Sequence, residues 1–291
     1  MEFIRLGSTI CELGESPLWD DRRKLLFYID IPAHAIHAIR LDGSDARSWS
    51  MPAIIGSIGL TESGKLIAAL KHDLMLFDPE TGALEPFARL PADEPGDNRL
   101  NDGKVGPDGA FWVGTMHDVA DRQPIGALYR VAPDGTVTRH VQGLRVSNGL
   151  AWSPDGRIMY HADTRNFWLD RWDFDPATGA IGNRTRLATF DGSIGLPDGG
   201  ATDADGVYWA TGAYGGRLNC YDASGMLVAW HPFPVPAPTM PCFCGPDLQM
   251  LAVTSHRTGT VAQQLDRFPE SGGLFIAQAP TKGAPIPRMP I

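Results

Sequence analysis

The stretch Ser147-Asn-Gly-Leu-Ala-Trp-Ser-Pro-Asp-Gly-Arg-Ile-Met-Tyr160 contains a pattern that recurs along the chain. Asn148 is followed eight residues later by a turn glycine, Gly156, and an apolar run begins ten residues after Asn148, at Ile158. The same offsets hold from three other starting points, and two looser copies complete the set. These starting residues are Asn101, Asp198 and Gly56, followed by Glu15 and Met240.

The spacing of these copies indicates the fold. The apolar runs begin at residues 25, 66, 111, 158, 208 and 250, so neighbouring copies are 41, 45, 47, 50 and 42 residues apart. Periods of about 40–50 residues with several short strands each are typical of β-propellers. Each unit supplies a sheet that buries its faces only against its neighbours. We therefore predict an all-β, six-bladed β-propeller of four-stranded antiparallel blades, with residues 1–291 as one domain.

The two ends of the chain predict how the ring closes. Residues 3–10 have strand character but precede the first copy, whereas residues 273–278 resemble the third strand of the last blade. We expect the amino-terminal segment to supply the outer strand of that last blade. Such closure removes the open sheet edges that would otherwise invite aggregation.

Superposing the copies places four polar residues at equivalent positions: Glu15, Asn101, Asn148 and Asp198. Each begins the strand that lines the central channel of a propeller, so we expect two carboxylates and two amides to converge there. Hard oxygen ligands suit Ca²⁺, Mg²⁺ or Mn²⁺ and tolerate Fe²⁺ or Zn²⁺. Glu15, Asn148 and Asp198 as three ligands would leave positions for water and substrate, as in a catalytic metal site. The alternative is that these groups only bind ordered water or blade backbone.

Composition limits the classes of partner. The formal net charge of −9 and the isoelectric point near 5.3 disfavour nucleic acid or an anionic membrane, so we expect a small neutral or cationic ligand. The first twenty residues lack a signal-peptide core, and no apolar run approaches the ~20 residues needed to cross a bilayer. We therefore expect a cytoplasmic protein, and we expect a monomer. The four cysteines include no CxxC pair, which favours free thiols.

Searches for other catalytic motifs give little. The chain contains no GxSxG nucleophile elbow and no HExxH zinc motif. Its eight histidines show no metal-ligand spacing, and His34 and His37 are expected to belong to an ordinary exposed strand.

Several phrases resemble the regucalcin (senescence marker protein)/gluconolactonase family. These are Gly14-Glu-Ser-Pro-Leu-Trp19, Arg99-Leu-Asn-Asp-Gly-Lys104, Ser147-Asn-Gly-Leu150 and Pro197-Asp-Gly199, and the resemblance runs from about residue 11 to 280. It implies a six-bladed propeller with one divalent cation in the channel and an activity that hydrolyses aldonolactones. Carried over by position, it makes Glu15, Asn148 and Asp198 metal ligands, and Arg99 and Asn101 substrate contacts.

One segment departs from the family pattern. Animal members carry an acidic residue soon after Gly-Thr-Met, where this chain has His117-Asp118-Val119 and a shorter loop. Strict spacing puts Val119 at the acidic position, but Asp118 offers a substitute. His117 is a further candidate contact for the substrate.

The sequence therefore predicts a divalent-metal-dependent lactonase for sugar lactones such as gluconolactone or xylonolactone. The cation would act as a Lewis acid on the lactone carbonyl, and Asp198 would act as general base. Two alternatives stay open: another metallohydrolase acting on aryl esters or organophosphates, and a calcium-binding regulatory propeller without turnover. The sequence leaves open which sugar and which cation are used, and whether Asp198 or a metal-bound hydroxide activates the water.

Overall fold

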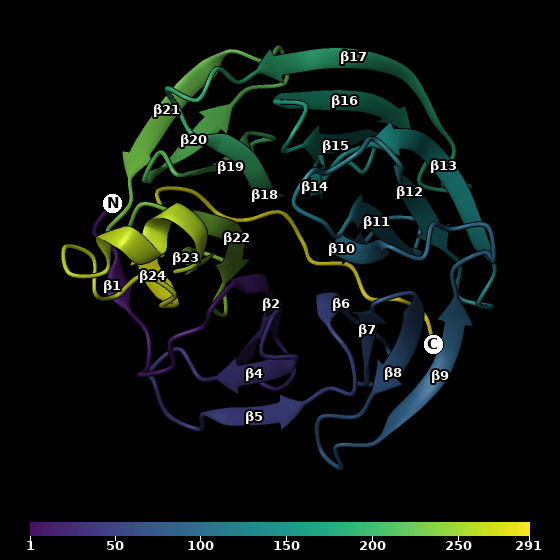
Figure 1. Cartoon of the computed structure of the whole chain (residues 1–291), viewed down its shortest axis with the longest axis horizontal. Helices are drawn as coiled ribbons and strands as arrows, with labels where there is room; N and C mark the ends of the chain where they lie inside the picture. Colours follow the sequence, from purple (N-terminus) through teal and green to yellow (C-terminus); the bar gives the residue numbers. More distant parts are fainter.

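Six four-stranded antiparallel sheets are arranged as blades around a central channel (Figure 1). The computed structural model describes residues 1–291. The innermost strands, one per blade, contact one another around the channel. They are β2 (Gly14–Asp20), β6 (Ile55–Leu60), β10 (Asn98–Val105), β14 (Ser147–Trp152), β18 (Leu196–Thr202) and β22 (Pro238–Cys244). The predicted fold class is confirmed.

The second strand of every blade begins at a residue where the sequence predicts an apolar run. These strands are β3 (Leu25–Asp30), β7 (Leu66–Leu70), β11 (Phe111–His117), β15 (Ile158–Asp163), β19 (Tyr208–Ala213) and β23 (Met250–Ser255). They are almost entirely buried because they pack between the faces of two neighbouring blades.

The outer strands are progressively more exposed, since they lie farther from the channel. The third strands are β4 (Ala35–Ile39), β8 (Asp73–Phe77), β12 (Gly126–Val131), β16 (Trp168–Phe174), β20 (Arg217–Tyr221) and β24 (Phe275–Gln278). The fourth strands are β5 (Arg47–Ser50), β9 (Leu84–Arg89), β13 (Val137–Leu144), β17 (Ile181–Thr189), β21 (Leu227–Pro232) and β1 (Ile4–Arg5).

The amino-terminal strand closes the ring, as predicted. β1 pairs antiparallel with β24 as the outermost strand of the last blade, with Ile4 opposite Ile276. The amide of Leu6 extends the ladder by donating to the carbonyl of Leu274 at 2.8 Å. The strand is shorter than the predicted 3–10 segment, but it covers the exposed edge of β24.

Aromatic residues fill the seams between blades. Between the third and fourth blades, the Trp112 ring lies edge-on to Trp152 and to Phe174, with centroids 6.5 and 5.6 Å apart. Edge-to-face pairs of this kind contribute about 0.5–1.5 kcal/mol beyond the burial of their area. Adjacent blades are therefore held together by packed cores rather than by backbone ladders.

A β-bulge recurs near the start of every innermost strand. The register with the second strand shifts between Glu15 and Leu18, between Asn148 and Ala151, and at the matching place in the other four blades. A bulge leaves residues unpaired and re-aims their side chains. In the fourth blade the bulge includes Gly149, whose φ of 66° lies in the left-handed region that favours glycine. A Cβ at this position would lie 2.6 Å from the Tyr208 hydroxyl.

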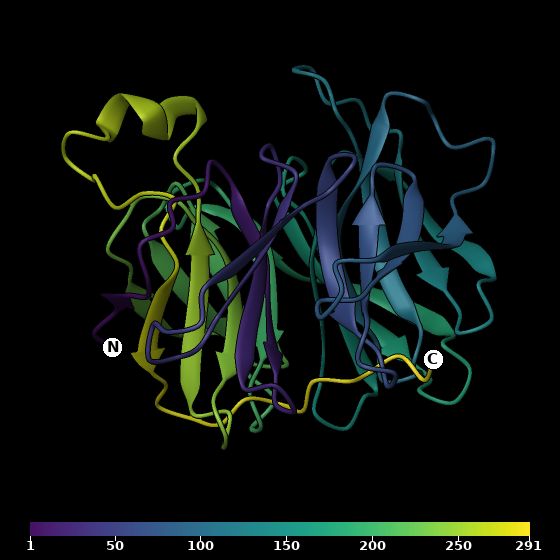
Figure 2. The same cartoon turned by 90° about the horizontal axis from the view of Figure 1, so that it is seen from below.

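Two features were not predicted. The chain between β23 and β24 includes a 3₁₀ helix, η1 (Gly259–Gln264), which projects above the ring (Figure 2). The carboxyl-terminal segment crosses the ring at the opposite end, where the Met289 amide donates to the carbonyl of Leu60 at 2.9 Å. A cavity of about 220 Å³ lies beneath that segment, lined in part by Lys104, Cys242 and Pro285. No helix has the length and apolarity needed to span a membrane.

We predict that residues 1–291 unfold as one unit, because each blade buries its faces only against its neighbours and the ring is closed. Calorimetry of the metal-free protein should give one transition with equal calorimetric and van't Hoff enthalpies. Two resolved transitions would contradict the single-domain prediction.

Candidate functional site

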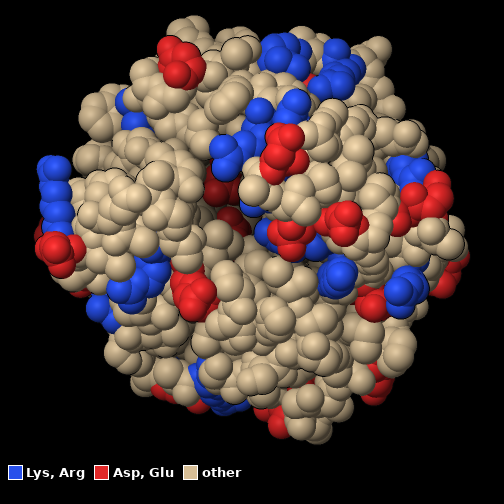
Figure 3. Space-filling view, in the orientation of Figure 1, with Lys and Arg blue, Asp and Glu red and all other residues tan.

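The innermost strands bring the predicted residues together at one end of the channel. The Asn148 amide nitrogen donates to Asp198 Oδ1 at 2.7 Å, and the Asn101 amide donates to the carbonyl of Ser147 at 2.9 Å. Glu15, Asn101 and Asn148 are buried, whereas Asp198 is partly exposed. Figure 3 shows acidic atoms at the bottom of the central hollow. All four lie on different blades, so only the ring brings them close.

Negative charge accumulates in this space. Burial raises the pKa of Glu15 well above its usual value, and the charges of Asp198 and Asp102 add to that rise. Burial and Asp102 also raise the pKa of Asp198, to about 7. Lys104 opposes this effect at Glu15 and Asp102, and its ammonium group donates to the carbonyl of Gly200. Three carboxyl groups thus share a buried space with one lysine.

The unused oxygens suit a hard divalent cation. The Asn148 amide nitrogen is occupied by Asp198 and by Thr164 at 2.9 Å, which leaves its oxygen free. Asp102 Oδ2 accepts from the amide of Leu150 at 2.9 Å, but its buried Oδ1 has no partner. Carboxylate and amide oxygens are the donors that Ca²⁺ and Mg²⁺ prefer. The donor chemistry of the site therefore fits the predicted cofactor.

Asp102 was missed as a charged member of this group. It follows Asn101 directly and occupies the same bulge, which breaks the strand alternation that would send it to the opposite face. Asp102 belongs to the stretch Arg99–Lys104 that resembles the family, and this was the one signal in the sequence that could have identified it. The spacing of the repeats gave no reason to select it.

Arg99 lies against the site on the same strand. Its guanidinium donates to Asn101 Oδ1 at 2.8 Å and to Asp118 Oδ1 at 3.2 Å. Burial lowers the pKa of Arg99, and the charge of Asp118 opposes that shift. The structure thus joins three of the predicted substrate contacts, Arg99, Asn101 and Asp118, in one hydrogen-bonded chain.

His117 has a positioning contact. It is the last residue of β11, and its Nδ1 accepts the backbone amide of Gln123 at 3.0 Å, which ties down the following loop. Val119, in the same loop, is 40 % exposed. A direct contact of His117 with substrate stays a prediction.

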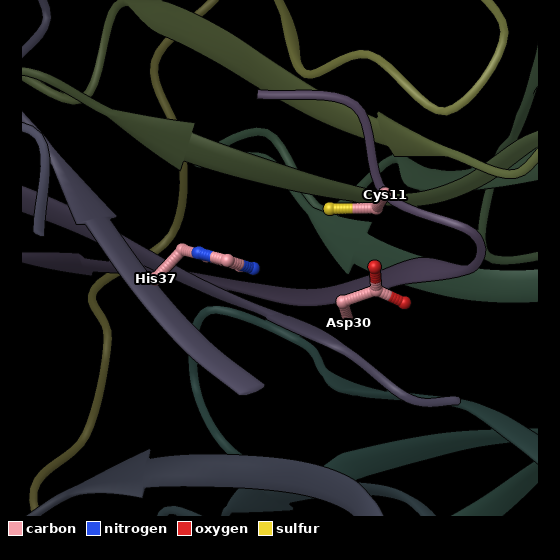
Figure 4. A group of neighbouring side chains, drawn as sticks. All are labelled: Cys11, Asp30 and His37. Atoms are coloured by element: carbon pink, nitrogen blue, oxygen red, sulfur yellow. The ribbon is translucent and has the colours of Figure 1, made fainter. Parts of the chain in front are cut away.

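One expectation about histidine is wrong. His34 lies in a turn, and His37 is half-buried in β4 rather than on an exposed strand. Its ring nitrogen, the Cys11 thiol and an Asp30 oxygen all lie within 4.8 Å of one another (Figure 4). Because the three residues come from three separate segments, sequence spacing did not reveal the group.

This second group is less suited to catalysis than the channel site. Both oxygens of Asp30 already accept backbone amides, from Glu12 at 2.9 Å and from Leu13 at 3.2 Å. Asp163, at the same place in the fourth blade, holds the amides of the loop before β14 in the same way. Asp30, which pairs with Gly14 at the start of β2, therefore has a structural role: it holds the segment that leads into its blade.

Comparisons with known proteins point to one family. The family model described as SMP-30/Gluconolactonase/LRE-like region matches residues 13–257. Regucalcin from Xenopus laevis is 33 % identical over 284 residues, and the 6-deoxy-6-sulfogluconolactonase of Pseudomonas putida is 36 % identical over 276; each match covers 94 % of both chains. The crystal structure of a calcium-binding protein, regucalcin, from Agrobacterium tumefaciens superposes with a TM-score of 0.93 at 30 % identity, covering 99 % of this chain and 97 % of the other.

The raised pKa of Asp198 predicts how stability depends on pH. In the unfolded chain its pKa is about 4, so between about pH 4 and 7 the folded, metal-free protein binds more protons. The free energy of unfolding should therefore fall as pH rises through this window. A bound cation displaces those protons, so Ca²⁺ should raise the melting temperature more at pH 8 than at pH 5.

The control is Asp198→Asn, which should flatten the pH dependence of the metal-free protein relative to wild type. If wild type and variant lose stability in parallel between pH 4 and 7, the carboxyl of Asp198 is not protonated as the structure indicates.

Proposed function

Because this chain belongs to the SMP-30/Gluconolactonase/LRE-like family, we propose that it is a divalent-cation-dependent hydrolase that opens aldonolactones to aldonic acids. The observation that carries the proposal is the convergence of Glu15, Asp102 and Asp198 with Asn148 at one end of the channel. Such crowded carboxyls are unfavourable without a cation, and they are typical of a functional site.

Glu15, Asn148 and Asp198 would hold the cation. When bound, the cation supplies Lewis acidity that polarises the lactone carbonyl. Asn148 contributes a neutral oxygen, which limits the number of negative charges around the ion. The hydrogen bonds from Asn148 to Asp198 and Thr164 fix the orientation of its amide.

Asp198 is the proposed general base. It is the partly exposed acid of the group, so water in the hollow reaches it more readily than it reaches Glu15 or Asp102. In the reaction Asp198 would take a proton from the water that attacks the carbonyl and later return it to the leaving ring oxygen. The Asn148 amide, 2.7 Å from Asp198 Oδ1, holds this carboxylate in place.

Arg99 and Asn101 would orient the sugar. Their mutual hydrogen bond and the contact of Arg99 with Asp118 hold the guanidinium at the site before substrate binds. Preorganised donors reduce the entropy lost on binding and place the carbonyl near the base. Arg99→Ala should therefore reduce kcat/KM while leaving cation affinity nearly unchanged.

The function is tested by reconstituting metal-free protein separately with Ca²⁺, Mg²⁺, Mn²⁺, Fe²⁺ and Zn²⁺. Base consumption is then followed with a panel of aldonolactones, one aryl ester and one organophosphate. We expect turnover of a lactone only with cation. Faster turnover of the ester or the organophosphate than of any lactone would instead favour a metallohydrolase for those substrates. Cation binding without any turnover would favour a regulatory propeller.

Glu15→Ala should lower the affinity for the cation, because it removes a direct ligand. The loss should exceed the roughly 10–100-fold that follows when a residue hydrogen-bonded to a ligand is removed. Calorimetric titration measures this loss, and circular dichroism checks the fold. Glu85→Ala, an exposed acid on β9, is the matched control and should bind like wild type. Retention of native affinity by Glu15→Ala would remove this residue from the ligand set.

Asp198→Asn distinguishes the role of Asp198 as general base from its role as cation ligand. The variant keeps an oxygen donor but cannot accept a proton, and loss of a general base costs about 10²–10⁴ in rate. We expect it to stay slow even when titrated to full cation occupancy, after subtraction of spontaneous hydrolysis. Near-native kcat at full occupancy would leave Asp198 as a ligand only.

A further inference from the structure

Basic side chains form part of the rim of the hollow that holds the acidic site (Figure 3). This is unexpected for a chain of net charge −9, and it differs from the neutral or cationic ligand that the overall charge suggests. A local cluster opposite in sign to the whole molecule indicates a specific partner rather than general solubility.

Arg122 lies close to the proposed site. Its guanidinium is partly buried, lying 3.3 Å from the Met116 sulfur and 3.3 Å from the carbonyl of His117. Met116 in turn is the strand partner of Arg99 on β10. Arg122 is therefore held beside the arginine that already belongs to the proposed site.

The loop that carries Arg122 is fixed in place. Arg145 donates from its guanidinium to the carbonyl of Arg122 at 2.6 Å, and the next amide, of Gln123, donates to the ring of His117. Arg122 is thus positioned by two contacts from its own surroundings, as a preorganised binding residue is.

The acids near the rim form no ion pair with Arg122. Asp118 pairs with Arg99, and Asp121 accepts from the side chain of Gln123 at 2.6 Å. Neither Arg122 nor Arg165 forms an ion pair with any carboxylate. Burial lowers the pKa of Arg122, the positive charges of Arg99 and then Arg165 lower it further, and the charge of Asp118 opposes these shifts.

The same space extends to the proposed base. Burial raises the pKa of Tyr214, the charge of Asp198 adds to that rise, and Arg165 and Arg122 oppose it. The charges of the two arginines and of Asp198 thus act on the same side chain, Tyr214. Arg165 directly follows Thr164, whose hydroxyl accepts the Asn148 amide at 2.9 Å, so the chain at Arg165 adjoins the proposed site.

Building on the proposed lactonase function, we propose that Arg122 and Arg165, together with Arg99, form an anion-binding subsite. The substrate is then an aldonolactone that carries a second acidic group, a sulfonate, phosphate or carboxylate, away from its lactone carbonyl. Arg122 is partly buried, Arg165 is exposed, and neither has a carboxylate partner, so both guanidinium groups are free to bind such an anion with charge-assisted hydrogen bonds.

The experiment compares 6-phosphoglucono-δ-lactone with glucono-δ-lactone and glucaro-1,4-lactone with glucono-1,4-lactone, using Ca²⁺-loaded protein and correcting for spontaneous hydrolysis. The measured quantity is the ratio of kcat/KM for each anionic lactone to that for the neutral lactone of the same ring size. We expect at least one ratio above about ten, since a charge-assisted hydrogen bond contributes about 1.5–3 kcal/mol. Which ratio is larger distinguishes a phosphate-like from a carboxylate substituent.

Arg122→Gln and Arg165→Gln should each lower that ratio several-fold, and added KCl should lower it in wild type. Arg165 is exposed and only its backbone amide is hydrogen-bonded, to Asp163, so its substitution does not threaten the fold. Arg157→Gln, at an exposed turn at the opposite end of the channel, removes the same charge and should leave the ratio unchanged.

A wild-type ratio near one, or a ratio that neither rim variant changes, would overturn the anion subsite while the lactonase activity stands. If none of the four lactones is hydrolysed, the proposed function fails together with the inference that rests on it.

Discussion

The pairing of β1 with β24 is the contact on which the rest of the molecule depends. It joins the two ends of the chain in one blade and closes six sheets into a ring. Without closure the first and last blades would each leave a face unburied. Closure also brings Glu15 of the first blade into the electrostatic reach of Asp198 of the fifth, 183 residues later in the chain. The candidate site is therefore a property of the closed ring rather than of any single blade.

Around the channel, the neighbouring blades are linked by polar contacts as well as by packed aromatic seams. Ser16 accepts the amide of Ile58 at 3.0 Å, and Thr239 donates to the carbonyl of Gly14 at 2.6 Å. Such contacts stiffen the inner strands, so the ring can hold carboxyl groups that repel one another. Burial, and then the charge of Asp102, raise the pKa of Asp198 to about 7. A divalent cation would balance the negative charge of the carboxyl groups in the channel, and an anionic group of the ligand would balance the positive charge of the arginines at the rim.

The repeat in the sequence was sufficient to predict the fold. Turn glycines such as Gly156 and apolar starts such as Ile158 are local signals, and they recur because every blade meets the same packing requirements. The equivalent positions of Glu15, Asn148 and Asp198 followed from the same register. What the sequence did not reveal depends on local irregularities of a strand and on contacts between separate segments. Asp102 reaches the site because of a bulge in β10, and the group of Cys11, Asp30 and His37 comes from three segments. Arg122 is recognised as a candidate binding residue only from its contacts in the structure.

The central claim is that the channel residues, rather than any other group, hold the divalent cation. Anomalous diffraction from crystals of the protein loaded with Mn²⁺ tests it most directly, since the ion's position is located without reference to activity. The account predicts one strong anomalous peak within bonding distance of oxygens of Glu15, Asn148 and Asp198. A peak at Cys11, Asp30 and His37 with none in the channel, at full Mn²⁺ occupancy, would contradict it.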